Sequence, residues 1–201
     1  MARYGMVIDL DMCIGCNACT MACKAEHATP AGVFYAKVLE KEIGKFPAAR
    51  RVFLPVLCNH CDKPACRDVC PTGATAKRED GVVWVDHDLC IGCRSCIEAC
   101  PYGARTYYEG DGAYFKGHTT RFEAAKQGGI PEGVVMKCNF CMHRVDQGLD
   151  PACVQTCPTE CRVFGDLDDP HSRVAHLVAD KKARPLLAEK GLEPSVFYIG
   201  S

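Results

Sequence analysis

Cysteine is the residue type that decides which chemistry this chain can support. The 201 residues include 17 cysteines, and all but Cys161 fall into four motifs of closely spaced thiols. Thiols separated by two or three residues are typical ligands of iron–sulfur clusters. In chain order, the four motifs are Cys13, Cys16, Cys19 and Cys23; Cys58, Cys61, Cys66 and Cys70; Cys90, Cys93, Cys96 and Cys100; and Cys138, Cys141, Cys153 and Cys157.

The spacing within the motifs indicates the type of cluster. The first and third motifs both read C-x2-C-x2-C-x3-C, a run in which three thiolates hold one [4Fe–4S] cube and the fourth crosses to another cube. The second motif has two extra residues in its middle, and the fourth contains the longer insert 142–152, for which we expect a loop. Sixteen ligands at four per cube predict four [4Fe–4S] clusters. Cys161 is left over, and we expect it to be a small buried residue.

The crossing of the fourth cysteine allows three ways of pairing the motifs. The connection from Cys70 to Cys90 is short and contains a predicted hairpin, which favours pairing the second motif with the third. The first motif then pairs with the fourth. The predicted cubes are Cys58, Cys61, Cys66 with Cys100; Cys90, Cys93, Cys96 with Cys70; Cys13, Cys16, Cys19 with Cys157; and Cys138, Cys141, Cys153 with Cys23.

The segments between the motifs are predicted to form short elements. Alternating apolar residues predict a strand over residues 4–10, and β-rich stretches predict a hairpin over 33–57 with its turn near 44–47. A second hairpin is expected between the second and third motifs, turning at Asp80-Gly81. Residues 121–126 are expected to form a short helix within 102–137, which we interpret either as a surface excursion or as a docking element.

The last part of the chain shows helix signals and an extended end. Asp169 followed by Pro170 is typical of a helix start. A second short helix is expected over 184–190, and residues 194–200 read as an extended apolar segment.

These elements predict an α+β fold of two ferredoxin-like modules with hairpin insertions and little regular secondary structure. Residues 1–57 with 102–169 would form the module of the first and fourth motifs. Residues 58–101 would form a central module, and 170–201 a helical and extended tail.

Several residues beside the cysteines are candidates for tuning a cluster. Lys24, Arg67, Arg94, Lys137 and Arg144 lie next to ligands, where a cation can raise a reduction potential, or they are solvated surface charges. His60 either donates a hydrogen bond to sulfur or packs in the interior, and Trp84 is expected in the core or shielding a cluster.

The sequence fits other functions less well. The start of the chain lacks an export signal and the cysteines are tightly clustered, which argues against disulfides. Structural zinc also uses C-x2-C pairs, so a zinc or scaffold protein stays an alternative. The formal charge of −1 would fall to about −9 with four cubes of about −2 each, which argues against nucleic-acid binding. We expect no transmembrane segment, because no apolar run is long enough.

The wording of three stretches carries a resemblance to a known family. Residues 58–66 read CNHCDKPAC, residues 70–74 read CPTGA, and residues 151–159 read PACVQTCPT. These stretches resemble the four-cluster iron–sulfur subunits of molybdopterin oxidoreductases, and most of all the polysulfide/thiosulfate reductase type. The resemblance covers nearly the whole chain, including residues 164–167, although the excursion between Cys100 and Cys138 looks longer than in compact members.

The resemblance implies a non-catalytic electron-transfer subunit. Its expected partners are a large molybdenum or tungsten catalytic subunit and a membrane quinone-reactive subunit or a soluble acceptor. The module of the first and fourth motifs would face the catalytic subunit, and the central module the acceptor. A free-standing carrier is the alternative. We expect membrane association through partners, on the cytoplasmic face, or on the outer side if a partner with a twin-arginine signal carries the chain across.

Overall fold

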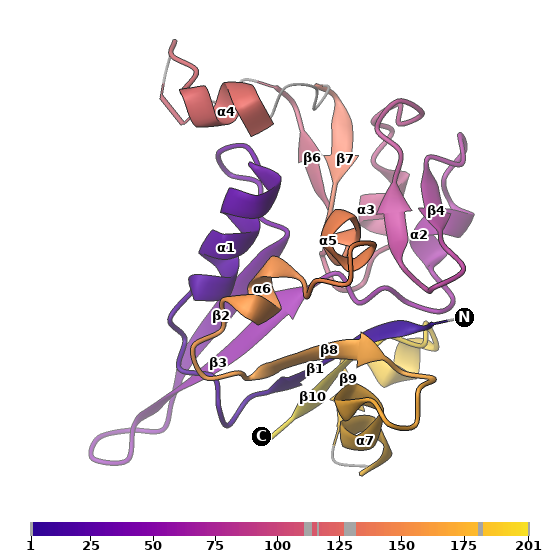
Figure 1. Ribbon diagram of the computed structural model, residues 1–201. Coiled ribbons are helices and arrows are strands. Elements are labelled where there is room, and N and C mark those ends of the chain that lie inside the picture. The colour runs from indigo at the N-terminus through magenta and orange to yellow at the C-terminus, as the bar shows by residue number, and fades with distance from the viewer. Residues whose placement is uncertain (1, 111–113, 116, 127–131, 181–182, 201) are drawn as a thin grey trace.

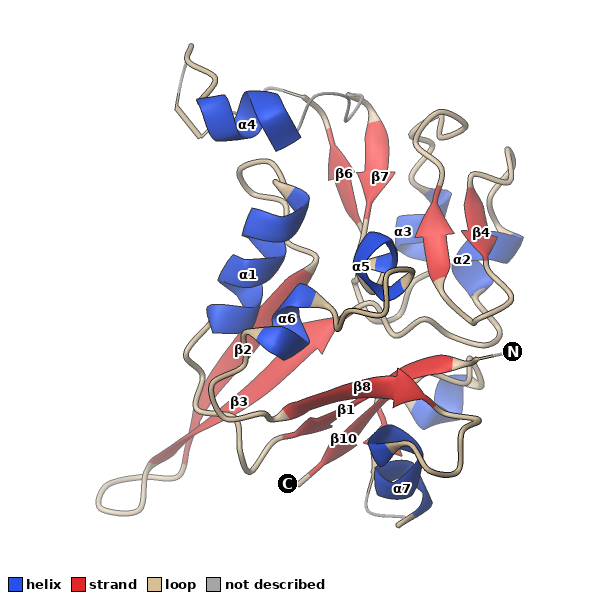
Figure 2. Cartoon of the chain, in the orientation of Figure 1, coloured by secondary structure: helices blue, strands red, loops and turns tan. Residues whose placement is uncertain are grey.

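The computed structural model describes residues 2–110, 114–115, 117–126, 132–180 and 183–200. It contains mixed helices and strands, and most of the helices are single turns (Figure 2). The elements are β1 Tyr4–Asp9, α1 Ala18–His27, β2 Ala36–Ile43, β3 Arg50–Leu57, α2 Ala65–Asp68, β4 Thr75–Lys77, β5 Val83–Val85, α3 Ser95–Glu98, β6 Thr106–Tyr108, α4 Arg121–Lys126, β7 Val134–Met136, α5 Met142–Val145, α6 Ala152–Gln155, β8 Arg162–Asp166, α7 Arg173–Ala179, β9 Arg184–Pro185, the 3₁₀ helix η1 Ala188–Lys190 and β10 Val196–Ile199.

One sheet joins the two ends of the chain. Its strand order is β8-β1-β10-β9, with β1 antiparallel to β8 and parallel to β10. The register places Ile8 opposite Arg162, and the strands from both ends lie side by side (Figure 1). Because β1 leads into the first motif and β8 follows the fourth, this pairing brings Cys13 and Cys157 to the same edge of the sheet.

Three hairpins connect the motifs. The expected hairpin before the second motif is confirmed, with β2 and β3 in register from Ala36 opposite Leu57 to Ile43 opposite Arg50, and it projects from the body (Figure 1). The expected Asp-Gly hairpin is confirmed as β4 and β5, in which Trp84 is only partly buried. The third hairpin pairs β6 with β7.

The helix predicted over 121–126 is present as α4. The rest of the expected excursion over 102–137 contains a short strand near each of its two ends, and residues 111–113, 116 and 127–131 lie outside the described residues.

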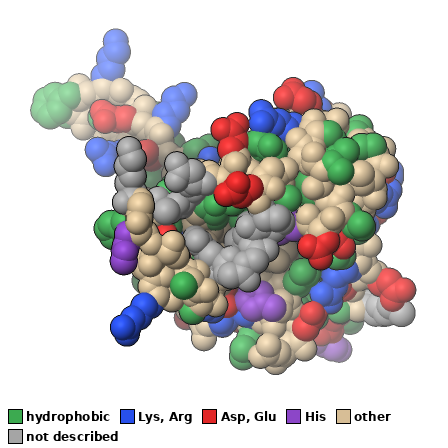
Figure 3. Space-filling model, turned by 90° about the horizontal axis from the view of Figure 1, so that it is seen from above, with side chains coloured by type: hydrophobic (Ala, Val, Ile, Leu, Met, Phe, Trp, Pro, Cys, Tyr) green, Lys and Arg blue, Asp and Glu red, His purple; other side chains and the backbone are tan. Residues whose placement is uncertain are grey.

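Acidic and basic side chains are interspersed on the face of the molecule shown in Figure 3.

Three local expectations differ from the structure. The tail helix α7 begins at Arg173, after Ser172, whose hydroxyl accepts a hydrogen bond from the N–H of Ala175; Asp169 instead accepts one from the N–H of His171 in a local turn. Residues 184–190 were expected as a helix, but Arg184 pairs with Tyr198 in the sheet and only η1 is helical. The insert 142–152, expected as a loop, begins with the helical turn α5. Tertiary pairing outweighed local propensity at the second of these positions.

The core is built partly from motif cysteines. Met6, Ile8, Met136 and Phe140 are almost fully buried beside thiols of the first, second and fourth motifs. At its centre the ring of His60 stacks on that of Phe140, with centroids 3.7 Å apart. Within the described ranges, no helix is both long and apolar enough to cross a membrane.

Candidate metal centres

Four groups of cysteine thiols are the candidate sites, and two of them line small pockets. Site A is a pocket lined by Cys13, Cys16, Cys19 and Cys157, with Cys161 at its wall. Site D is a pocket lined by Cys90, Cys93, Cys96 and Cys70. Each pocket therefore combines three thiols of one motif with the last thiol of another.

The other two groups lie deeper. In each of them, the neighbouring thiols raise the pKa of one cysteine, which shows that the four thiols lie close together. Site B contains Cys138, Cys141, Cys153 and Cys23. Burial raises the pKa of Cys23 strongly, and the three other thiols of site B raise it further. Site C contains Cys58, Cys61, Cys66 and Cys100; burial raises the pKa of Cys61 to about 12, and the other three thiols contribute.

The residue before the second cysteine has a left-handed backbone in all four motifs. The φ angles are 68° at Gly15, 42° at His60, 65° at Gly92 and 53° at Phe140. In the two motifs without glycine, this turn directs the N–H of His60 to Cys58 Sγ at 3.5 Å and that of Phe140 to Cys138 Sγ at 3.4 Å. The same turn therefore folds the backbone around the thiols in every motif, although the side chains differ.

The two glycines are also required by close packing. A Cβ at Gly15 would lie 2.3 Å from the ring of Phe53, and one at Gly92 would lie 2.1 Å from the carbonyl oxygen of Gly133. Glycine permits both the positive φ and the close approach. The segments that contain Phe53 and Gly133 can therefore pack closely against sites A and D.

Threonines after the last cysteine supply further hydrogen bonds to sulfur. Thr72 Oγ1 lies 3.8 Å from Cys70 Sγ, and Thr159 Oγ1 lies 3.7 Å from Cys157 Sγ. The N–H of Thr75 donates to Cys70 Sγ at 3.4 Å. Burial acts to raise the pKa of Cys70, but the hydrogen bonds from these threonines lower it. Such bonds favour the thiolate, which is the form that binds iron.

Three buried cations lie among the thiols. Arg105, Lys137 and Arg162 are only 5%, 5% and 2% exposed. Among the described residues none of them pairs with a carboxylate, and Arg162 Nε has no hydrogen-bond partner. A buried charge without a counter-ion is strongly destabilising. The donor set of thiols and the buried cations together fit a negatively charged metal–thiolate group.

Arg105 and Arg162 make direct contacts with cysteine sulfur. Arg105 Nη2 donates to Cys66 Sγ at 3.0 Å, and its Nη1 donates to Thr75 Oγ1 at 3.1 Å. Arg162 Nη2 lies 3.4 Å from Cys19 Sγ. Sequence reasoning missed both arginines. A signal was present, because each stands five residues after the last cysteine of its motif.

The cations that the sequence did single out mostly bind elsewhere. Lys24 donates to the carbonyls of Thr29, Pro30 and Val33; Arg67 pairs with Asp68; Arg94 pairs with Glu109; and Arg144 pairs with Glu26. Lys137 is the buried exception, and its ammonium donates to the carbonyls of Val83 and Cys138. Of the five cations chosen because they lie near a ligand in the sequence, only Lys137 is therefore buried.

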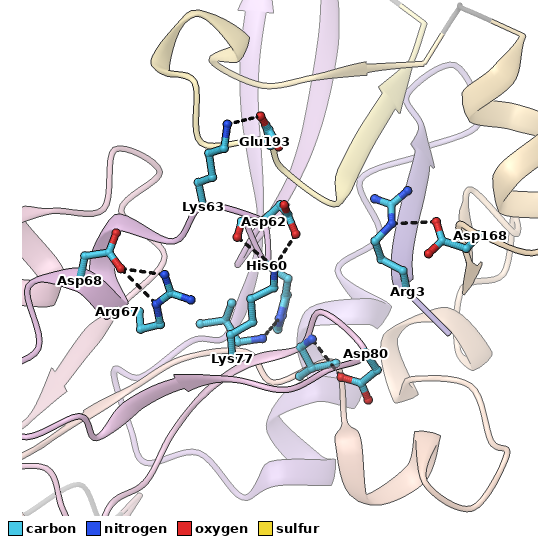
Figure 4. Close-up of polar contacts among 12 residues, drawn as sticks. Arg3, His60, Asp62, Lys63, Arg67, Asp68, Lys77, Asp80, Asp168 and Glu193 are labelled. Carbon is cyan, nitrogen blue, oxygen red and sulfur yellow. Dashed lines mark hydrogen bonds and ion pairs between the residues drawn. The ribbon is translucent and has the colours of Figure 1, made fainter. Parts of the chain in front are cut away.

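His60 serves packing between the second and fourth motifs. Its Nδ1 accepts a hydrogen bond from the N–H of Val83 at 3.0 Å, and its ring stacks on Phe140. Burial and the nearby Lys137 and Arg105 hold its pKa well below the usual value, so the ring is neutral. Figure 4 shows it among the polar contacts of this region, including that of Lys63 with Glu193 from the C-terminal segment.

Cys161 is buried, as expected, and lies against site A. Its Sγ is 3.5 Å from Cys157 Sγ. Burial, together with the hydrogen bond to Cys157, raises the pKa of Cys161 to about 12. The side chain is therefore a neutral thiol that contacts one of the candidate ligands.

Comparison with known proteins defines the class first. Two families of 4Fe–4S dicluster domains match the chain, one at residues 49–132 and 124–167 and the other at residues 12–74. The chain is thus a 4Fe–4S protein with ferredoxin-like dicluster domains.

Relatives that match almost the whole of this chain then define the family. The chain is 42% identical to a putative dimethyl sulfoxide reductase iron–sulfur subunit of Halobacterium salinarum, with 99% of this chain and 79% of the relative covered. It is 44% identical to a selenate reductase subunit of Mesobacillus selenatarsenatis, covering 98% and 72%. It is 39% identical to an arsenate respiratory reductase iron–sulfur subunit of a Shewanella species, covering 99% and 97%. The chain belongs to the iron–sulfur electron-transfer subunits of molybdopterin oxidoreductases.

Proposed function

We propose that the chain holds four [4Fe–4S] clusters, one each in sites A, B, C and D, and relays electrons through them in that order. The observation that carries this proposal is the grouping of sixteen thiols into four sets of four, with buried cations between the sets. When bound, each cluster takes up and releases one electron. The chain's own residues supply the thiolates, exclude water and compensate the negative charge.

Contacts and electrostatic effects between neighbouring groups support the order. Arg162 contacts Cys19 of site A and lies 4.0 Å from Cys153 of site B. Burial raises the pKa of Cys138 in site B, and Cys58 of site C is the next contributor. Arg105 contacts Cys66 of site C and acts electrostatically on Cys96 of site D. These links form an unbranched path.

The two ends of this path lie at the surface. Cys16 of site A and Cys93 of site D are exposed, whereas Cys58 and Cys138 of the inner sites are buried. Beside the exposed thiols, Ile14 is 59% exposed and Ile91 is 67% exposed. Electrons can therefore enter at one end and leave at the other without crossing a thick protein layer.

We assign the partners from the family. Site A would face a large molybdopterin subunit carrying molybdenum or tungsten, and site D a membrane quinone-reactive subunit or a soluble acceptor. The chain would then associate with a membrane through its partners. Sites C and D would form one ferredoxin-like module, residues 58–101, and sites A and B the other, residues 1–57 with 102–169.

Metal and subunit analysis tests this function. Anaerobically purified protein is expected to contain about sixteen irons per chain and to co-purify with a large molybdenum or tungsten subunit in constant stoichiometry. Stoichiometric zinc, or an iron content near eight, would contradict the four-cluster assignment. Purification of the fully loaded chain alone, without a large subunit, would favour a free-standing carrier.

A further inference from the structure

The three buried cations occupy the three boundaries between successive sites. Arg162 lies between sites A and B, with its two terminal nitrogens 3.4 Å from Cys19 Sγ and 4.0 Å from Cys153 Sγ. Arg105 lies between sites C and D, bound to Cys66 Sγ and to Thr75, whose N–H in turn donates to Cys70 Sγ. Each guanidinium is therefore linked to both of the sites that it separates.

Arg105 and Arg162 stand at equivalent positions after the third and fourth motifs. Each follows the Cys-Pro at the end of its motif by the same number of residues. Arg105 immediately precedes β6, and Arg162 is the first residue of β8. Arginine remains protonated throughout the accessible pH range. A fixed positive charge is thus placed between sites A and B and between sites C and D, at the same spacing from the preceding motif.

Lys137 occupies the remaining boundary, between sites B and C. It precedes Cys138 of site B in the chain, and its ammonium donates to the Cys138 carbonyl and to the carbonyl of Val83. Val83 in turn donates its N–H to His60, which lies between Cys58 and Cys61 of site C. The ammonium is therefore held between the two inner sites by main-chain carbonyls, without a carboxylate among the described residues that would cancel its charge.

We propose that Arg162, Lys137 and Arg105 each raise the reduction potentials of the two sites that they separate, so that every step of the relay passes a fixed positive charge. This inference rests on the proposed four-cluster function. Charge and hydrogen bonding to sulfur are the levers by which a protein sets such potentials. A cation between two sites stabilises an electron on either one, and it screens the repulsion between neighbours that are both reduced.

The electron balance of a step is simple. One electron leaves the donor site, which is oxidised by one unit, and enters the acceptor site, which is reduced by one unit. The cation between them keeps its protons, and no bond is formed or broken. The step therefore needs no proton donor at these buried positions.

Potentiometric titration of the holo-protein, followed by EPR, tests the proposal. The variants are Arg162→Gln, Lys137→Gln and Arg105→Gln, each compared with the unmodified chain. Each is expected to lower two of the four one-electron midpoints. At a fixed potential the reduced-to-oxidised ratio of those two sites should fall by about tenfold, equivalent to 59 mV for one electron.

The test does not require each reduction wave to be assigned to a site, because the three variants are expected to shift overlapping pairs of waves. Arg162→Gln and Arg105→Gln must shift different pairs of waves, and Lys137→Gln must shift one wave from each pair. Arg162→Lys and Arg105→Lys keep the charge and should leave the midpoints near their original values. Arg3→Gln is the control, because Arg3 is exposed, pairs with Asp168 and lines neither site A nor site D, and it should shift no midpoint.

With full iron content, three outcomes would overturn the proposal: unchanged midpoints, an equal shift of all four waves, or the same pair shifted by all three glutamine variants. Loss of iron from the glutamine variants would assign the cations to cluster assembly and would also overturn it. Failure of the proposed function is distinguishable, because it would appear in the unmodified protein as fewer than four waves.

Discussion

The two halves of the molecule reach similar thiol arrangements by different routes. The central half holds sites C and D, whose cysteines all lie between residues 58 and 100. The terminal half holds sites A and B, which draw on residues 13–23 and 138–157. In the central half the local β4–β5 hairpin brings Cys70 next to Cys90, whereas in the terminal half the long-range β1–β8 pairing brings Cys13 to Cys157. The same site geometry therefore depends on local contacts in one half and on closure of the whole chain in the other.

The difference carries an entropic consequence. Closing a long loop costs more conformational entropy than closing a short one, although the cost rises slowly with length. The terminal half offsets this cost with a larger sheet, in which β10 pairs with β1 and Tyr198 donates a hydrogen bond to the carbonyl of Pro55. We expect the terminal half to be the more sensitive of the two to changes at the chain ends.

Deletion of residues 196–201 is expected to have the largest effect. It removes β10, and with it the parallel neighbour of β1 and the buried side chains of Val196 and Tyr198. Sites A and B should be lost and sites C and D kept, so the iron content should fall to about half, or eight irons. Leu39→Asp, on an exposed face of β2, is the control and should keep all the iron. Loss of all four clusters together would show that the halves are not independent.

Removal of one candidate ligand should have the next largest effect. Cys157→Ala is expected to lose one cluster from site A, measured as about four irons and as one missing reduction wave. Cys161→Ala is the matched control, because its sulfur lies only 3.5 Å from that of Cys157 but is the extra thiol of the site. Full iron content in Cys157→Ala, or loss of iron in Cys161→Ala, would mean that the two cysteines exchange roles.

A smaller effect is expected at the contact between the halves. Phe140 is 1% exposed and stacks on His60, so Phe140→Ala should destabilise the protein by about 3–5 kcal/mol. Phe122→Ala, at a phenylalanine that is 50% exposed, should change stability by less than about 0.5 kcal/mol. Guanidinium unfolding of the two variants measures the difference. Equal midpoints would show that the stacked rings do not hold the halves together.

The smallest effect concerns an ion pair within the terminal half. A hydrogen bond from His143 and the charge of Arg144 hold the pKa of Glu26 below its usual value, against the opposing effect of burial. Because the folded pKa is depressed, Glu26 stabilises the protein above its unfolded pKa and loses this contribution as the pH falls through the folded pKa. Glu26→Gln should therefore be less stable by no more than about 1 kcal/mol at pH 7. The free energies of unfolding of the variant and the unmodified protein should converge as the pH falls through the folded pKa of Glu26. A difference in unfolding free energy that stays constant from pH 7 into acid would contradict the account.

Much of the local structure could be predicted from the sequence. Motif spacing predicted that the cysteines within one motif lie close together, and the Asp80-Gly81 signal predicted the β4–β5 hairpin, because both depend on residues close together in the chain. The alternating residues 4–10 likewise predicted β1.

Long-range contacts set the limit of that reasoning. The sequence does not reveal that Arg184 pairs with Tyr198, or that Arg162 lies between two groups of thiols, because both follow from the sheet register. For the same reason, four cations chosen for adjacency to a ligand proved to bind carbonyls or carboxylates instead. Only the equal spacing of Arg105 and Arg162 from their motifs could have indicated in advance that both lie buried against cysteine sulfur.

Spin quantitation of the fully reduced protein tests the four-site relay most directly. EPR integration against iron content on the same anaerobic sample should give about four spins for about sixteen irons, with a broad spectrum from magnetic interaction between neighbouring sites. A spectrum of two or fewer isolated, non-interacting spins at full reduction would contradict a continuous path from site A to site D.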